Sequence, residues 1–550
     1  MEDRGILRAL NSTNREALMI RLRSSALRAC SLLALGLIGP AFITPESIAQ
    51  TPRTRAEASD YMETSRYADV MEFIDAVVPE SDLLHSGTMG YTNEGRRIPL
   101  IVAGRVENAS AAAVADSGKL RVYLQGNIHA GEVCGKEALQ MLLREVAQGD
   151  HNAWFEDVVL LIAPIYNADG NERVDLGNRP GQNGPYGGMG QRPNAQDLDL
   201  NRDHMKLESP EARSVVGMMR EYDPHVSVDL HTTNGTRHAY HLTYSPPLNP
   251  NTHSAIDDLL RDRWLPAMTE SIRAKYGWEY YYYGNTPFRR DAEPGWYTFD
   301  HRPRFNNNYI GLRNRVAILS EAYAYATFEN RVLASLYFVR EIVDYAATND
   351  VDIRAAIDAA DATSLPGDEL GVRATAARSD EQVEILMGDT ENGTHPLTGR
   401  RHLIRRDVVR PERMYEYGSF EPTATETVPA AYLVPGELDA VIDRLRAHGI
   451  RLTETSTSQV MQVEEFHIES SQQAAREFQG HQERRIEGAY ELANREIPAA
   501  TWRVEMNQPL ARLAFYLLEP RSDDGLANWN FLDEAIEASA IYPIVRVPAR

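Results

Sequence analysis

Cysteine, lysine and long apolar segments are all scarce in this 550-residue chain. The two cysteines, Cys30 and Cys134, exclude the multiple-disulfide framework that stabilises many small secreted domains. Lysine occurs only at positions 119, 136, 206 and 275, so almost all of the positive charge is arginine, from which no function is inferred. No repeat of 20–50 residues is evident, and no second long apolar run follows the one near the N-terminus.

The charge balance is strongly acidic. The chain has 57 basic and 79 acidic residues, a formal net charge of −22. Such a balance argues against broad nucleic-acid binding and against docking on an anionic membrane, because both need a basic face. The 43% hydrophobic and 25% charged content is typical of folded globular proteins, and the length favours two to four domains.

The first 50 residues have the pattern of a signal peptide. Arginines between positions 15 and 28 precede the apolar run 32–38, and small and polar residues then continue to position 50. The run is too short for a comfortable membrane span, so we expect an exported protein, periplasmic or secreted, without a stable membrane anchor after cleavage. Cleavage would remove Cys30 and leave one thiol, Cys134, which is interpreted as a buried structural residue.

Apolar runs alternate with helical patterns between about residues 60 and 345. A continuous apolar run such as 158–162 is typical of a strand that is buried on both faces. The alternation predicts an α/β domain over 51–350, with a mixed, mostly parallel sheet and helices on both faces. The strands are expected at 120–124, 158–162, 226–230 and 316–319, with a helix at about 132–147.

A different pattern follows the α/β region. The Ala/Asp-rich segment 351–380 is interpreted as a connector, and 381–550 as a β-rich accessory domain. One amphipathic helix is expected at 437–449, where a glycine would end it. The acidic, Gln-rich stretch around 464–485 is interpreted as solvated, and the Gly-rich segment 181–192 as an irregular loop.

Four ionisable residues fall just beyond the carboxyl ends of the predicted strands. They are His129, Glu132, His231 and Glu321. The carboxyl ends of strands are where open α/β sheets bind ligands, and two histidines with a carboxylate suit zinc. Singly, each has a simpler explanation, such as a loop ion pair between His129 and Glu132, or a strand-end acid at Glu321. His225 is a rival ligand, but it lies at the start of its strand.

Together these residues resemble the metal triad and catalytic glutamate of the zinc metallocarboxypeptidases of the carboxypeptidase A type. His129, Glu132 and His231 match that family's ligands in order and spacing. The resemblance covers roughly residues 60–345 and extends to the Asn167–Gly170 signature, the pair Asn201 and Arg202, Arg192 upstream of that pair, and Glu321 in ILSEAYAY.

The resemblance implies roles for these residues. Zinc would be held by the triad, Glu321 would act as general base, and Arg192 would stabilise the oxyanion, although Arg179 lies in the same stretch. Arg202, helped by Asn201, would bind the terminal carboxylate of the substrate. A substrate-binding tyrosine is expected at Tyr309, with Tyr297 as the other candidate.

The function expected from this resemblance is an exported zinc carboxypeptidase acting on peptides with a free C-terminus. Two alternatives stay open: a zinc-dependent amide hydrolase with a non-peptide or cell-wall substrate, and a non-catalytic binding protein on the same fold. Other divalent ions also occupy such sites, and the sequence predicts neither a side-chain preference nor an oligomeric state.

Overall fold

The computed structural model describes residues 51–233, 235–287 and 292–549. The predicted signal peptide, 1–50, therefore lies outside the described residues. Among those described, no helix combines the length and the apolar composition that a membrane span requires.

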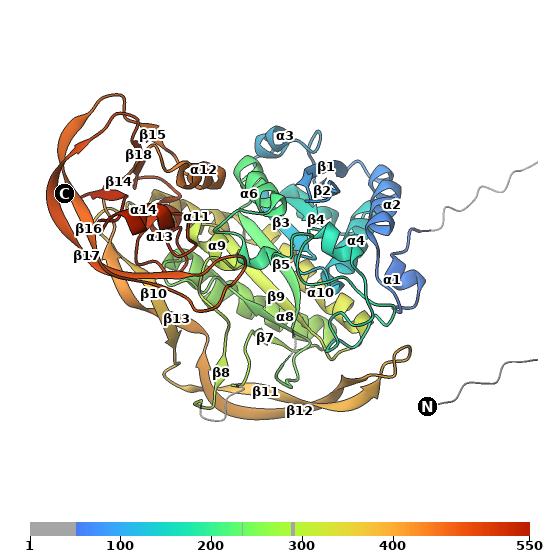
Figure 1. The fold of residues 1–550 in the computed structure, drawn as a ribbon. Coiled ribbons are helices and arrows are strands. Elements are labelled where there is room, and N and C mark those ends of the chain that lie inside the picture. Colours follow the sequence, from blue (N-terminus) through green and yellow to red (C-terminus); the bar gives the residue numbers. More distant parts are fainter. Residues whose placement is uncertain (1–50, 234, 288–291, 550) are drawn as a thin grey trace, which may run out of the picture. The chain divides into compact units, whose positions relative to one another are not determined.

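An eight-stranded sheet forms the centre of the fold (Figure 1). Strands β4, β3, β5 and β9 are neighbours and run parallel, while β2 and β6 join this group antiparallel. The predicted mixed, mostly parallel sheet is confirmed. In spatial order the strands are β1 (Leu84–Tyr91), β2 (Arg97–Ala103), β4 (Val158–Ala163), β3 (Leu120–Gly126), β5 (Val226–Thr233), β9 (Val316–Tyr323), β6 (Leu242–Ser245) and β7 (Tyr280–Tyr282).

Side chains alternate between two hydrophobic cores along these strands. In β4, Leu160 belongs to one core and its neighbour Leu161 to the other, because successive strand residues point to opposite faces. All residues of β4 and β5 are buried, as the continuous apolar runs predicted. Helices contribute to both cores: α2 (Tyr67–Val77), α4 (Cys134–Ala147), α8 (Leu265–Tyr276), α10 (Phe328–Thr348) and α11 (Asp350–Ala362) to the first, and α6 (Pro210–Tyr222) and α9 (Asn306–Leu312) to the second.

The C-terminal region is built from antiparallel strands and short helices. Its six-stranded sheet has the order β15-β18-β14-β19-β16-β17, and two long hairpins, β11–β12 and β16–β17, extend from the region (Figure 1). The strands are β10 (Glu369–Ala377), β11 (Gln382–Thr394), β12 (Arg401–Tyr417), β13 (Ser419–Thr427), β14 (Ala431–Val434), β15 (Thr453–Glu454), β16 (Gln459–Gln473), β17 (Arg484–Ile497), β18 (Trp502–Glu505) and β19 (Val545–Val547).

Three helices accompany these strands: α12 (Asp439–His448), α13 (Ala511–Leu518) and α14 (Asp533–Ala538). Helix α12 ends at Gly449, whose φ of 87° is the left-handed conformation that favours glycine, as the sequence predicted. Apolar residues of the region, such as Tyr432 and Phe515, belong to the same core as Leu161 of the central sheet. The division into domains at 351–380, where α11 and β10 lie, stays a prediction.

Candidate metal centre and active site

The predicted zinc ligands meet at one end of the parallel strands. His129 and Glu132 follow β3, and His231 lies two residues before the end of β5. On the next strand Glu321 pairs in register with His231. Since parallel neighbours end at the same edge of a sheet, residues from three distant segments of the chain become neighbours there.

The three ligand side chains point their donor atoms at a common centre. The Nδ1 atoms of His129 and His231 are 3.2 Å apart, and each lies about 3 Å from a carboxylate oxygen of Glu132. All three residues are buried, and their ligand atoms lie within 4.8 Å of one another. Two imidazole nitrogens and one carboxylate are the donor set of many catalytic zinc sites.

A carboxylate orients each histidine from behind. His129 Nε2 is 3.0 Å from Asp199 Oδ1, and His231 Nε2 is 2.9 Å from Asp229 Oδ2. Such contacts fix the ring so that the other nitrogen faces the metal. Burial opposes ionisation of Asp199, but His129 and Arg192 hold the pKa of its carboxyl well below the usual range. The site therefore fits zinc in its ligands and in their support.

These residues line a cavity of about 210 Å³. It is also lined by residues predicted to catalyse the reaction or to bind substrate, so the structure brings most of the predicted site together. The predicted residues that line it are His129, Glu132, Arg192, Asn201, Arg202, His231 and Glu321, and the others are Arg179, Thr232, Thr233, Tyr283, Phe299, Phe305 and Leu319.

Glu321 has a free acceptor atom at this cavity. Its Oε2 is buried and has no hydrogen-bond partner among the described residues. Burial raises the pKa of the Glu321 carboxyl to about 8, and the nearby Glu132 carboxylate adds to the shift. An unsatisfied buried oxygen is costly in a folded protein, so its presence beside the ligand cluster indicates a functional group.

Arg202 presents an unpaired guanidinium to the same cavity. Its Cζ lies 3.7 Å from the centre of the Phe305 ring, and its Nη1 donates to the backbone oxygen of Asn201. Within the part of the chain that the structure describes, no carboxylate forms an ion pair with Arg202. Burial lowers the pKa of Arg202 to about 10. The planar donors of this side chain are therefore available for an incoming carboxylate.

Both arginines considered for oxyanion stabilisation reach the ligand cluster. Arg179 Nη2 is 2.6 Å from Glu132 Oε1. Arg192 Nη1 is 3.8 Å from that oxygen, while Arg192 Nη2 forms an ion pair of 2.7 Å with Asp199 Oδ2. The choice between Arg192 and Arg179 therefore stays open.

Tyr309 does not reach the cavity, so its assignment as a substrate contact needs correction. It is fully buried on α9, where its hydroxyl bonds His448 Nδ1 at 2.8 Å. Tyr297 lies outside the cavity too, and its ring stacks on Tyr417. The tyrosine that lines the cavity is Tyr283, which directly follows β7. Its place at a strand end is the sequence signal that could have identified it.

Two more contributors escaped the sequence-based prediction. Asp199 and Asp229 were not assigned to the metal site, although Asp229 could have been found from its spacing. Asp229 precedes His231 by two residues in one strand, so both lie on the same face of the sheet. Asp199 precedes Asn201 by two residues in the DLDLNR segment, but only the fold shows that this segment reaches His129.

Comparisons with known proteins agree with this geometry. A family model described as zinc carboxypeptidase matches residues 70–298. Carboxypeptidase 2 of Trichophyton tonsurans is 26% identical over 483 residues, which cover 83% of this chain and 81% of that protein. Carboxypeptidase D of Mus musculus is 31% identical over 169 residues, 26% of this chain and 12% of that protein.

Solved structures of the same kind also match. A metallo-carboxypeptidase from Burkholderia cenocepacia is 16% identical, with a TM-score of 0.38 over 51% of this chain and 69% of that one. Carboxypeptidase A from Helicoverpa armigera is 15% identical, with a TM-score of 0.34 over 56% and 74%. The family match spans residues 70–298 and includes His129, Glu132 and His231, so this region of the chain is similar to the zinc carboxypeptidases and carries three side chains placed to hold a metal ion.

Proposed function

We propose that the protein removes single amino acids from the C-termini of peptides that end in a free carboxylate. The observation that carries this proposal is the cavity at the strand ends. It combines the zinc ligands with Glu321, whose Oε2 has no partner among the described residues, and with Arg202, whose guanidinium has no carboxylate partner there. A binding protein without turnover would not need the buried base.

Each residue has a chemical task in this proposal. Zinc, when bound, supplies a Lewis acid that polarises a carbonyl group and lowers the pKa of water. Glu321 Oε2 accepts a proton from the attacking water and then passes it to the nitrogen of the leaving amine. Arg202 holds the terminal carboxylate and thereby selects the last peptide bond. Arg192 or Arg179 stabilises the negative charge that develops on the carbonyl oxygen.

Export is a second part of the proposal, supported by the signal-peptide pattern of the first 50 residues. N-terminal sequencing of the protein recovered outside the cytoplasm tests it. A start near position 51 supports export with cleavage, whereas an intact leader on protein retained in the cytoplasm contradicts it.

The activity is tested by mass spectrometry of a mixed peptide pool incubated with the zinc-loaded protein. We expect ladders that lose single residues from the C-terminus. Glu321→Gln should lower the rate by about 10³-fold, because it removes the base and keeps the size of the side chain. The same peptides with amidated C-termini provide the matched substrate control.

The outcomes are distinguishable. Loss of residues from free but not amidated C-termini supports the carboxypeptidase proposal. Internal cleavage, or equal cleavage of both pools, contradicts the role of Arg202. No cleavage by protein with confirmed zinc rejects a peptide substrate and favours a non-peptide amide or a binding role.

A further inference from the structure

The turn between β16 and β17 contacts Asp199, the carboxylate that lies against the metal-site residue His129. Gln479, in this turn, accepts a hydrogen bond of 2.7 Å through its Oε1 from the backbone nitrogen of Asp199. The two residues are 280 positions apart in the chain. The stretch around 464–485 was interpreted as solvated, so this contact between a C-terminal hairpin and the active site was not expected from the sequence.

Asp199 connects several parts of the active site. Its Oδ1 accepts from the Asn201 backbone nitrogen at 3.0 Å and lies 3.0 Å from His129 Nε2, while its Oδ2 pairs with Arg192. One carboxylate therefore fixes a metal ligand, the start of the Asn201–Arg202 segment and a candidate oxyanion arginine. A shift of the Asp199 backbone would move all of these contacts together.

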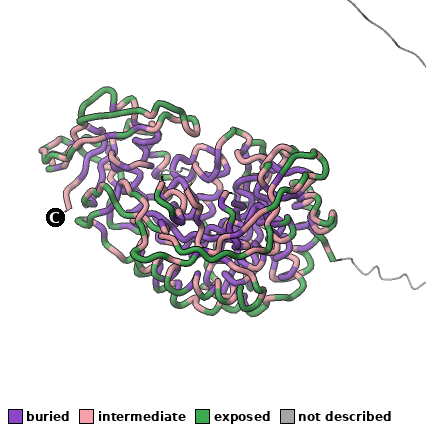
Figure 2. The backbone as a smooth tube through the Cα atoms, turned by 90° about the horizontal axis from the view of Figure 1, so that it is seen from below, coloured by how far each residue is buried: buried purple, intermediate pink, exposed green. Residues whose placement is uncertain are grey.

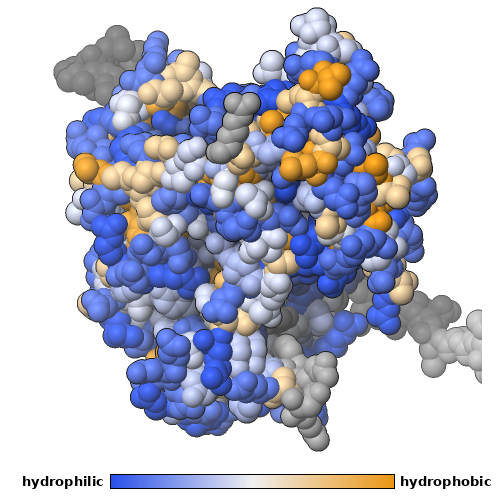
Figure 3. Space-filling view, turned by 90° about the vertical axis from the view of Figure 1, so that its left-hand side faces the viewer, coloured by the Kyte–Doolittle hydropathy of each residue, from blue (hydrophilic) through white to orange (hydrophobic). Residues whose placement is uncertain are grey.

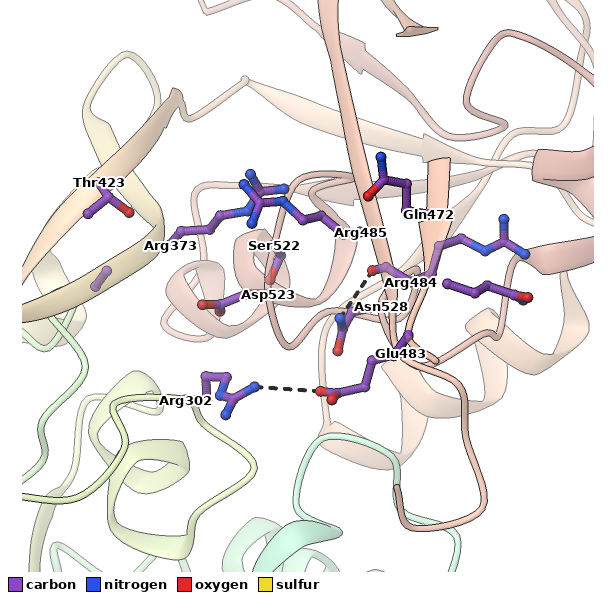
Figure 4. A pocket seen from close by; sticks show the side chains of 13 residues that line it. Arg302, Arg373, Thr423, Gln472, Glu483, Arg484, Arg485, Ser522, Asp523 and Asn528 are labelled. Carbon is purple, nitrogen blue, oxygen red and sulfur yellow. Dashed lines mark hydrogen bonds and ion pairs between the residues drawn. The ribbon is translucent and has the colours of Figure 1, made fainter. Parts of the chain in front are cut away.

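The turn is anchored on the catalytic region by polar and aromatic contacts. His481 Nε2 lies 3.0 Å from Glu208 Oε1, and Glu483 forms ion pairs with Arg302 and Arg304. Figure 4 shows the Arg302–Glu483 pair at the edge of a cavity of about 460 Å³ that separates this part of the hairpin from β10 and β13.

Arg304 strengthens this anchorage and links it to the substrate side. Its side chain is 2% exposed, and it pairs with Asp524 at 2.8 Å as well as with Glu483. The next residue is Phe305, whose ring lies under Arg202. The residue after that, Asn306, donates its backbone hydrogen to Asn201 Oδ1 at 2.8 Å. The C-terminal region thus contacts Arg304, and the two residues that follow Arg304 contact the carboxylate-binding pair.

The backbone of Gln479 is itself unusual. Its φ is +52°, a left-handed conformation that few residues other than glycine adopt, and Gly480 follows with φ of +79°. A glycine at 479 would adopt this conformation more easily. The presence of a glutamine here is explained if its side-chain oxygen has a task that outweighs the backbone cost.

We propose that Gln479 is a positioning residue of the zinc site, which acts through Asp199 on His129 and Arg192. The inference rests on the proposed zinc carboxypeptidase function, and it assigns part of the active site to the C-terminal region. That region then contributes a residue to the support of the site.

The test compares three full-length variants with the unmodified protein. Gln479→Met keeps the length of the side chain but removes the acceptor oxygen, and Gln479→Gly removes the acceptor while easing the backbone conformation. Gln482→Ala, at an exposed position in the same turn, is the matched control. The readouts are zinc affinity by chelator competition, the visible absorption spectrum of the Co²⁺-loaded protein, melting temperature, and kcat and KM.

We expect Gln479→Met and Gln479→Gly each to weaken zinc binding by about fivefold, the typical weight of one hydrogen bond, and to shift the Co²⁺ spectrum. The control should change neither. A positioning role predicts weaker zinc binding in Gln479→Gly even where its melting temperature equals or exceeds that of the unmodified protein. Unchanged zinc affinity and spectrum in both variants would overturn the inference.

The metal readouts also separate this inference from the proposed function. If the unmodified protein binds zinc but cleaves no peptide, the proposed substrate is wrong, and the zinc affinities of the variants still decide the role of Gln479. If Gln479→Met fails to fold, Gln479→Gly supplies the same comparison without the backbone cost.

Discussion

The central sheet and the C-terminal hairpins differ in how deeply their strands are buried. Every residue of β4 is buried, whereas β17 alternates between buried, half-buried and exposed positions along its length. In Figure 2 buried residues gather in the interior of the trace, with half-buried and exposed residues along its outer parts. The face shown in Figure 3 is mostly hydrophilic, with hydrophobic residues scattered over it.

The difference shows two ways to place a functional residue. A strand buried on both faces is fixed by packing, so the residue at its end, such as Glu321, has a defined position. A hairpin with a solvent-exposed face has fewer packing contacts along its length. Its turn therefore needs contacts of its own, such as those of His481 and Glu483. The buried strands of the central sheet position the metal-site residues, and the β16–β17 hairpin supports these residues through contacts of its turn.

The largest expected difference between the two regions is the effect of removing an arginine side chain from the cavity or from an exposed hairpin strand. Arg202→Ala should lower kcat/KM for peptides with a free C-terminus by about 10²- to 10³-fold, because a buried carboxylate would lose its charged partner. Amidated peptides should lose far less. The matched control is Arg410→Ala on the exposed hairpin strand β12, which should change neither value. Equal losses for both substrates would contradict the role of Arg202.

The loss of stability on truncating a leucine should differ between the central sheet and the C-terminal hairpins. Leu160 in β4 is fully buried, while Leu492 in β17 is 63% exposed. Leu160→Ala should lower the free energy of unfolding by about 3 kcal/mol, through lost burial and the cavity left behind. Leu492→Ala should change it by less than about 0.5 kcal/mol. Urea unfolding of both variants measures this, and similar losses would show that the hairpin is packed as tightly as the sheet.

Support of the metal should depend on the carboxylates behind the histidines. Asp229→Asn should weaken zinc binding by about tenfold or more, because the amide no longer favours the ring orientation that presents His231 Nδ1. Asp407→Asn, at a side chain that is 95% exposed on β12, is the control and should leave zinc affinity unchanged. Chelator competition at fixed pH compares the two, and equal affinities would reject the role of Asp229.

Low pH should destabilise the contact between helix α12 and the catalytic region. His448 of α12 bonds Tyr309 of the catalytic region, and burial, with the nearby Arg313, lowers the pKa of His448 to about 3. Because this folded-state pKa lies below the unfolded value of about 6.5, the stabilisation is complete above pH 6.5 and is lost as the pH falls toward 3.

At pH 5.5 the loss from this one residue should reach about 1.4 kcal/mol. Urea unfolding at pH 7.5 and 5.5 should therefore show a smaller difference for His448→Gln than for the unmodified protein. An identical difference for both proteins would show that His448 is not responsible.

The sequence predicted four of the eight strands of the central sheet, and the candidate zinc ligands, because these depend on local patterns. Four apolar runs became β3, β4, β5 and β9, and the residues at their ends converged as the topology of parallel strands requires. The predicted strands ended too early, however, since His231 and Glu321 are still paired within β5 and β9. The β-rich character of the C-terminal region was also predicted.

Contacts between distant segments could not be predicted in this way. Tyr309 and Tyr297 were the predicted candidates and Tyr283 was not, because spacing along the chain does not show which side chain reaches a cavity. Gln479 lies in a polar stretch with no periodic pattern, so nothing local distinguishes it from solvated glutamines. Its role depends on the meeting of two segments 280 residues apart, which only the tertiary structure shows.

The in-register pairing of His231 with Glu321 has a consequence for insertions and deletions during evolution. One residue inserted into β9 ahead of Glu321 would turn its carboxylate to the opposite face of the sheet, because side chains alternate along a strand. The same insertion between β11 and β12 would only lengthen a turn. Length variation among relatives of this chain should therefore accumulate in the β11–β12 turn and be rare in the strands that carry the metal centre.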